Sequence, residues 1–148
     1  MPGRESLAQQ RYYAHPRNSF WPIVTGLFGI TETDYQQKSD QLTLRGVAVW
    51  DVLKTCSRKG SLDADINDRT IVTNDFQAFF AQHSAIAHVF FNGAKAEAVY
   101  LKRVLPGLAG AQAMLKLHRL PSTSPAYAGM TMKQKAKEWQ AILEQEFE

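Results

Sequence analysis

Apolar residues along this chain follow two different spacings, which alternate from one stretch to the next. Spacings of three and four residues, typical of an amphipathic helix, occur in four stretches: residues 18–30, 74–83, 94–105 and 131–147. Short unbroken apolar runs, typical of buried β-strands, occur in three stretches: residues 46–53, 87–93 and 111–120. Because strand-like and helix-like stretches alternate, the pattern predicts an α/β domain with a parallel sheet.

Cap residues support the first and the last of these helices. Asn18 or Ser19 can cap the first helix, and Pro22 lies in its first turn, where proline is tolerated. The last helix begins with the capping box Thr131-x-x-Gln134 and is expected to continue as one long amphipathic helix. These ends are therefore expected to be fixed by the local sequence.

The polar stretches of the chain show where loops and ligands are expected. Residues 54–70 are polar and are expected to form a surface loop. The chain has no internal repeat and no long linker, so we expect a single domain over residues 1–148. Ligands of an open parallel sheet bind beyond the carboxyl ends of its strands. Three stretches follow the predicted strands there: WDVLKTC, NGAKAE and LPSTSPA.

Composition narrows the classes of protein to which the chain can belong. With 148 residues, 45% of them hydrophobic, the chain can bury a core of its own. Cys56 is the single cysteine, which excludes an intrachain disulfide and a cysteine-held iron–sulfur cluster. No signal sequence or membrane helix is evident, so we expect a cytoplasmic protein. The formal charge of +3 permits a polyanionic partner. No metal-ligand spacing or nucleotide-binding loop is found, so we expect no metal and no cofactor.

Four stretches taken together resemble a known family: MPGRESLAQQRYYAHPRNSFWPI, GVAVWDVL, VFFNGAKAE and LPSTSPA. They are similar to the uracil-DNA glycosylase superfamily, and most closely to its hypoxanthine-DNA glycosylase branch. The resemblance implies a three-layer α/β/α sandwich on a short, four-stranded parallel sheet. It also implies that a damaged nucleotide is flipped out of DNA into a pocket at the strand ends.

The resemblance further implies a first strand that ends in a G-x-x-P-G turn, whereas this chain begins at Met1-Pro2-Gly3, inside that turn. We therefore expect an N-terminally truncated domain. Either the gene start was assigned to an internal methionine, or the chain is a remnant that lacks the strand. In the first case, the upstream reading frame should encode an apolar strand before Met1. Met1 stands where other branches carry an acidic or amide residue, so that chemistry is missing here.

Three polar residues match the positions that act on the base and the sugar in this family. The resemblance casts Asn18 as catalytic, because its amide can position a water against the sugar; the alternative is a helix N-cap. Asp51 is expected to accept a hydrogen bond from a ring N–H of the base, or else to be a strand-end turn residue. Asn92 is expected to contact the base or the backbone, or else to form an Asn-Gly turn.

A second group of residues is expected to bind DNA or stack on the base. Between its two prolines, the loop LPSTSPA carries three hydroxyl residues that the resemblance assigns to DNA contacts: Ser122, Thr123 and Ser124. Arg17 and His15 lie close to the proposed catalytic loop and are expected to bind DNA as well. Tyr13 and Phe20 offer rings for base stacking, with core packing as the alternative. Leu120 replaces a catalytic histidine of some relatives, and we expect His118 to be a partly buried structural residue.

These observations predict a monofunctional DNA glycosylase that removes hypoxanthine, with uracil as a second choice, and leaves an abasic site. Its partner is double-stranded or single-stranded DNA with a deaminated base, and the protein is expected to act as a monomer without binding membranes. The alternative is a truncated, catalytically impaired DNA-binding remnant of such an enzyme. A small-molecule α/β hydrolase is disfavoured because the chain has no nucleophile elbow or triad.

Overall fold

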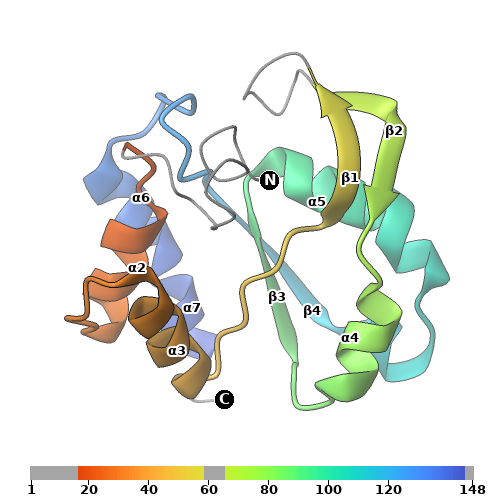
Figure 1. Ribbon diagram of the computed structural model, residues 1–148, viewed down its shortest axis with the longest axis horizontal. Helices are drawn as coiled ribbons and strands as arrows, with labels where there is room; N and C mark the ends of the chain where they lie inside the picture. The colour runs from red at the N-terminus through yellow and green to blue at the C-terminus, as the bar shows by residue number, and fades with distance from the viewer. Residues whose placement is uncertain (1–16, 59–65, 146–148) are drawn as a thin grey trace. The chain divides into compact units, whose positions relative to one another are not determined.

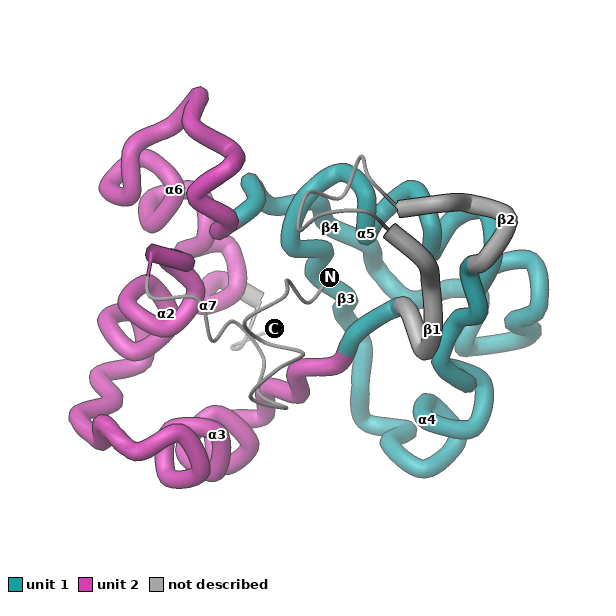
Figure 2. Tube along the Cα trace, turned by 45° about the horizontal axis from the view of Figure 1, so that its top comes forward, with its two compact units in different colours: residues 1, 51–122 teal, residues 2–50, 123–148 magenta. Residues whose placement is uncertain are grey.

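The computed structural model describes residues 17–58 and 66–145. The chain divides into two compact units, drawn in different colours in Figure 2. Residues 51–122 form the first unit, and the segments before and after them form the second. The chain passes from one unit to the other after Trp50 and again after Ser122. Both crossing points fall inside motifs that the sequence analysis singled out.

The first unit contains a parallel strand pair, a separate antiparallel hairpin and several helical segments (Figure 1). In chain order, the elements are β1 (Leu53–Arg58), β2 (Ile66–Thr73), α4 (Phe76–Gln82), β3 (His88–Asn92), α5 (Ala94–Val99), the π-helical turn η2 (Tyr100–Val104), the 3-10 turns η3 (Leu105–Gly107) and η4 (Gly110–Met114), and β4 (Lys116–Leu120). β3 and β4 are parallel, as predicted for this part of the chain, and pair from His88 opposite Lys116 to Asn92 opposite Leu120. The helix α5 joins them, so this part is a β-α-β unit.

Aromatic and branched side chains from four elements and two loop positions form the core of the first unit. The buried cluster consists of Val52, Phe76, Phe80, Phe91, Val99, Tyr100, Val104 and Leu108. Tyr100 lies at its centre, with its ring centroid 5.0 Å from that of Phe91 and 5.8 Å from that of Phe76. The predicted apolar stripes of α4 and α5 therefore both face this core.

The second unit is helical. Its elements are α2 (Phe20–Phe28), α3 (Tyr35–Leu44), α6 (Met132–Trp139) and α7 (Ala141–Gln145). The first and last predicted helices pack against each other through Phe20 and Trp139, whose ring centroids lie 5.8 Å apart. α2 ends at Gly29, whose φ of 65° is a left-handed conformation that glycine adopts at little cost. No helix in the described part of the chain has the length and apolarity that crossing a membrane requires.

The strand predicted at residues 46–53 begins later in the chain than the apolar pattern indicates. Residues 47–51 are not part of a strand, and β1 begins only at Leu53. Val47 donates its backbone N–H to the carbonyl of Leu42, in the preceding helix, and Leu53 pairs with Thr73. Ala48 and Trp50 are exposed, and burial begins only at Asp51 and Val52, so the first half of this run is not the buried strand that its apolar residues predicted. A strand also needs a partner for its backbone groups.

The predicted surface loop at residues 54–70 is also corrected by the structure. β1 and β2 form an antiparallel hairpin there, with register shifts along the pair, and residues 59–65 between them lie outside the described residues. β2 was not predicted because its first half is mostly polar, although its second half, TIVT, consists of β-branched residues that favour a strand. The hairpin belongs to a two-stranded sheet separate from the β3–β4 pair.

Two further predictions hold for only part of their length. Of the predicted strand 111–120, the first half is the 3-10 turn η4, and only Lys116–Leu120 is strand. The capping box at Thr131 and Gln134 is present, but the long terminal helix is divided at Gln140 into α6 and α7. Phe147, which the sequence places on its apolar stripe, lies outside the described residues.

The helix α3 was not predicted. It has little amphipathic pattern, because Leu42 is its one buried residue. Its start is nevertheless marked in the sequence by Asp34, whose side chain accepts a hydrogen bond from the backbone of Gln37 at 3.2 Å. A capping residue without an apolar stripe was too weak a signal to predict this helix.

The core of the first unit yields a stability prediction. The hydroxyl of Tyr100 is buried, and the described residues offer it no hydrogen-bond partner. Burial raises the pKa of this hydroxyl, which therefore stays neutral at physiological pH. We expect Tyr100→Phe to raise the free energy of unfolding by about 1 kcal/mol and Tm by about 2 to 4 °C in thermal unfolding.

The matched control is Tyr127→Phe, because Tyr127 is 45% exposed and its hydroxyl can bond to water. Its Tm should equal that of the native protein. A Tm for Tyr100→Phe below the native value would mean that the Tyr100 hydroxyl stabilises the fold.

Candidate functional site

The carboxyl ends of β3 and β4 place two predicted site residues at one edge of the first unit. Asn92 is half-buried and is the last residue of β3, opposite Leu120, the last residue of β4. The backbone N–H of Gly93 donates to the carbonyl of Leu120 at 3.0 Å, which ties the two strand ends together. Ser122 follows two residues later. Asn92 and Ser122 therefore lie at the same edge of the parallel pair, where the sequence placed them.

Gly93 is required by the geometry of this edge. Its φ of 97° is rarely adopted by residues with a side chain, and a Cβ atom here would lie 3.1 Å from the Cβ of Ser122. The Asn-Gly pair thus forms a tight turn, the alternative given for Asn92, with the positive φ at the glycine. A turn does not exclude a role for the Asn92 side chain, which stays a prediction.

Asp51 is one of three polar or charged residues that are buried in the described part of the chain, and is 9% exposed. Its backbone carbonyl accepts a hydrogen bond from the side chain of Asn74 at 2.6 Å, and the backbone N–H of Asn74 donates to Val52 at 3.0 Å. Asn74 therefore fixes the backbone on which Asp51 stands. Asn74 was not predicted as a site residue, and its only signal in the sequence is its place two residues before α4.

In the second unit, Asn18 caps the helix that begins after it. Its side-chain oxygen accepts a hydrogen bond from the backbone N–H of Phe20 at 2.9 Å, whereas the Ser19 side chain makes no capping bond. The N-cap alternative is therefore present in the structure. An amide oxygen has two lone pairs and the amide nitrogen two protons, so a capping Asn18 keeps the capacity to hold a water. The cap fixes the orientation of the side chain.

The loop after β4 is tied to the start of α2. The backbone N–H of Ser19, next to Asn18, donates to the carbonyl of Thr123 at 3.0 Å. Thr123 has an exposed fraction of 0%, so its hydroxyl does not reach the surface, contrary to the predicted direct contact with DNA. No local pattern indicates this bond, because its two residues are far apart along the chain. It holds the two predicted functional loops of this unit together.

The rest of this loop is held by hydrogen bonds within the loop and from α6. The carbonyl of Ser124 accepts hydrogen bonds from the backbone N–H of Tyr127 at 3.0 Å and from the Lys135 side chain at 3.2 Å. The hydroxyl of Ser124 accepts a hydrogen bond from the backbone of Ala126 at 3.2 Å. Pro125 lies at the second position of this turn, where its fixed φ is favourable.

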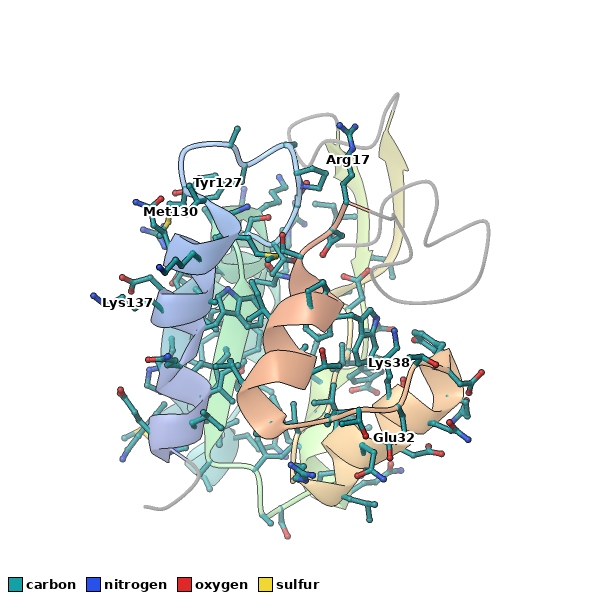
Figure 3. All side chains as sticks on the ribbon, turned by 90° about the vertical axis from the view of Figure 1, so that its left-hand side faces the viewer. Arg17, Glu32, Lys38, Tyr127, Met130 and Lys137 are labelled. Carbon is teal, nitrogen blue, oxygen red and sulfur yellow. The ribbon has the colours of Figure 1, made fainter. Side chains whose placement is uncertain are left out.

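The remaining predicted residues have different surroundings. Arg17 is exposed and extends outward from the start of α2 (Figure 3). Phe20 is 4% exposed and its ring contacts the rings of Trp21 and Trp139, which favours the core-packing alternative over base stacking. Tyr13 and His15 lie outside the described residues.

The histidine of β4 has the structural surroundings that the sequence predicted. His118 is half-buried, and its Nε2 lies 3.1 Å from Nδ1 of His88 on the neighbouring strand. Its ring stacks on that of Phe90, with centroids 4.6 Å apart. Within residues 17–58 and 66–145, no group of three or more histidine, cysteine or acidic side chains is arranged to hold a metal ion.

Comparison with known proteins connects this geometry to a family. The family model of the Uracil DNA glycosylase superfamily matches residues 1–147. A hypoxanthine DNA glycosylase of Methanosarcina acetivorans is 33% identical over 144 residues, which cover 96% of this chain and 85% of the relative. A hypoxanthine DNA glycosylase of Methanosarcina barkeri is 32% identical over 97 residues, which cover 64% of this chain and 60% of the relative.

A solved structure shows the same fold. A protein of Methanosarcina acetivorans, determined by solution NMR and provisionally assigned as a uracil DNA glycosylase, superposes with a TM-score of 0.77 and 31% identity. The match covers 99% of this chain and 86% of that chain. Together with the helices and the short parallel sheet, it gives the chain the α/β class of the uracil DNA glycosylase fold, as predicted.

The turn at the strand ends can be tested by adding one methyl group. Gly93→Ala places a Cβ against Ser122 and a side chain in a backbone region used almost only by glycine, so we expect the free energy of unfolding to fall by about 1 to 3 kcal/mol. Gly26→Ala, in α2, is the matched control, because nothing lies within 4 Å of the added Cβ.

In the same denaturant titration, the control should raise the free energy of unfolding by about 0.5 to 1 kcal/mol, since alanine favours helix over glycine. Equal effects of the two substitutions would show that the strand-end turn does not constrain residue 93.

Proposed function

Because this chain belongs to the uracil DNA glycosylase superfamily, we propose that it is a DNA glycosylase that removes a deaminated base from DNA. Hypoxanthine is the proposed main substrate, and uracil the second. The observation that carries this proposal is the similarity along nearly the whole chain to a relative named as a hypoxanthine DNA glycosylase. The products would be a free base and an abasic site, and the protein would act as a monomer on DNA.

We assign the positioning of the attacking water to Asn18. As the sugar gains oxocarbenium character, a water held on the amide is oriented toward the anomeric carbon. An amide is not a strong base, so its contribution is orientation rather than proton removal. The hydrogen bond from the Phe20 backbone supports this assignment, because it holds the amide in one orientation before DNA binds.

We assign recognition of the base to Asp51, with Asn92 as a second contact. A carboxylate accepts but does not donate, so it suits a ring N–H such as N1–H of hypoxanthine or N3–H of uracil. The burial of Asp51 supports this role, because a hydrogen bond to a charged group is stronger where water is excluded. Asn92 can donate to a carbonyl oxygen of the base from its place at the end of β3.

We assign contacts with DNA phosphates to Ser122, Ser124 and Arg17. Arg17 is exposed beside the Asn18 turn, and a guanidinium binds phosphate through several donors. Thr123 has a different proposed role: its buried carbonyl holds Ser19, and so fixes Asn18 relative to the loop. The net charge of +3 is compatible with a polyanionic substrate.

The activity can be tested on duplexes that carry one inosine, one uracil or no damage. We expect release of free hypoxanthine from the inosine duplex, slower release of uracil, and none from the undamaged duplex. The DNA strand should stay intact until an abasic-site nuclease is added, because the proposed chemistry uses water and no lysine.

Strand cleavage that persists without the nuclease would contradict the monofunctional mechanism. Binding of the inosine duplex without release of any base would contradict the proposed enzyme activity and favour the alternative, a catalytically impaired DNA-binding protein.

Substitutions of Asn18 separate its two roles. Asn18→Asp keeps an oxygen that can cap α2, so we expect normal stability but a changed rate, since a carboxylate activates water differently and repels phosphate. Asn18→Ala should lower the single-turnover rate on inosine DNA by about 100- to 1000-fold with little change in DNA affinity. It should also lower the free energy of unfolding by about 0.5 to 2 kcal/mol, because the cap is lost.

Measuring stability, affinity and single-turnover rate on the same preparations distinguishes these effects. Native rates in both variants, with only the stability of the alanine variant reduced, would leave Asn18 as a helix cap alone.

A further inference from the structure

Lys135 is buried although nothing in the sequence marks it as a core residue. It is 3% exposed, whereas Lys133 and Lys137 on the same helix, α6, are exposed. Figure 3 shows Lys137 extending outward from that helix. Removing an ammonium group from water is unfavourable, and burial accordingly lowers the pKa of Lys135. A buried lysine therefore calls for a specific set of partners.

Both partners of the Lys135 ammonium described by the structure are in the loop that precedes α6. It donates a hydrogen bond to the carbonyl of Ser124 at 3.2 Å, and it lies 5.2 Å from the centroid of the Tyr127 ring. An ammonium at that distance from an aromatic ring is attracted to the negative charge of its face. One positive charge thus stabilises both ends of the Ser124–Tyr127 turn.

The turn itself restricts where the Tyr127 ring can lie. The backbone N–H of Tyr127 donates to the same Ser124 carbonyl that accepts from Lys135. Pro125, inside the turn, has a fixed φ and loses little conformational freedom when the loop binds a partner. The ring is therefore held at its backbone and at its face before any ligand is present.

Tyr127 is nevertheless 45% exposed. Among the large hydrophobic residues exposed in the described part of the chain, Trp50 and Tyr127 are the aromatic ones. Tyr127 stands in the loop to which DNA contacts are assigned above, and Figure 3 shows it in the loop at the start of α6, near Met130. An exposed aromatic ring held in place by a buried charge is suited to stack on a flat ligand.

We propose that Tyr127 stacks on a nucleobase of the bound DNA and that Lys135 is the positioning residue that holds its ring. The inference rests on the proposed function, because it takes DNA as the ligand of this loop. Every base has an aromatic face, so the contact is independent of sequence. It supplements the polar contacts of Ser122, Ser124 and Arg17 with an apolar one, and it compensates in part for unstacking of the target base.

The test is a double-mutant cycle on DNA affinity, measured by fluorescence anisotropy with an inosine duplex. Tyr127→Ala should weaken binding by about 5- to 150-fold, as expected for the loss of stacking on one base. Tyr127→Phe keeps the ring and should bind as tightly as the native protein. Lys135→Met keeps the length of the side chain but removes the charge, and should weaken binding by less than Tyr127→Ala.

The double variant decides whether Lys135 acts through Tyr127. If it does, Lys135→Met should add nothing once the ring is gone, so the double variant should bind like Tyr127→Ala. Lys137→Met is the matched control, since it removes one positive charge from an exposed position on the same helix. It should weaken binding by less than Lys135→Met at moderate salt, where distant surface charges are screened.

Thermal unfolding of each variant separates positioning from stability. Lys135→Met should be at least as stable as the native protein, because an apolar side chain replaces a buried charge. Native affinity of Tyr127→Ala would overturn the stacking contact. Additive losses in the double variant would overturn the role of Lys135 as its positioning residue.

The same measurements keep this inference distinct from the proposed activity. A native protein that binds the duplex and loses affinity in Tyr127→Ala supports stacking even if no base is released, in which case only the glycosylase proposal fails. A native protein that binds neither inosine DNA nor undamaged DNA overturns both.

Discussion

The parallel pairing of β3 and β4 is the constraint on which the arrangement of the site residues depends. Because parallel strands run in the same direction, their carboxyl ends meet at one edge, and the loops that follow both strands begin there. The bond from Gly93 to Leu120 closes this edge, and a Cβ atom at residue 93 would lie only 3.1 Å from that of Ser122. Asn92 and the first serine of the Ser/Pro loop are thereby placed at the same edge by the backbone.

In the second unit, hydrogen bonds of backbone and buried polar groups hold the loop that follows β4. The loop that leaves β4 passes at once into Thr123, whose buried carbonyl holds Ser19, and then into the turn held by Lys135. Of the three polar or charged residues buried in the described part of the chain, two are Thr123 and Lys135, and the third is Asp51. A polar group is buried at little cost only where hydrogen-bond partners in the protein replace the water that it loses. Their concentration in and beside two family motifs is a physical reason to associate those motifs with function.

Asn18 illustrates how a structural and a chemical role can share one residue. The capping bond to Phe20 uses one lone pair of the amide oxygen and fixes the side chain at the start of α2. A side chain fixed in this way loses little entropy on binding a water or a sugar, so the cap favours the proposed chemistry rather than competing with it. Phe20, by contrast, is committed to the core through Trp21 and Trp139.

The sequence by itself determined the features that depend on neighbouring residues. The ends of α2, the capping box of α6, the strand β3 and the Asn-Gly turn follow from local patterns of caps, apolar spacing and glycine. The four motifs also identified the family, because a combination of short motifs is specific even where each one alone is common.

Tertiary structure decided what depends on partners far away in the chain. The apolar run at residues 46–53 became a strand only from Leu53, where β2 supplies hydrogen bonds, and the polar segment after it contributes to both strands of the hairpin. The bond from Ser19 to Thr123 joins segments that lie far apart along the chain. The hydrogen bond from the buried Lys135 to Ser124 joins the helix α6 to the loop that precedes it. Periodicity reports which residues avoid water, but it does not report which backbone group or charge they meet. Those pairings are set by packing in three dimensions.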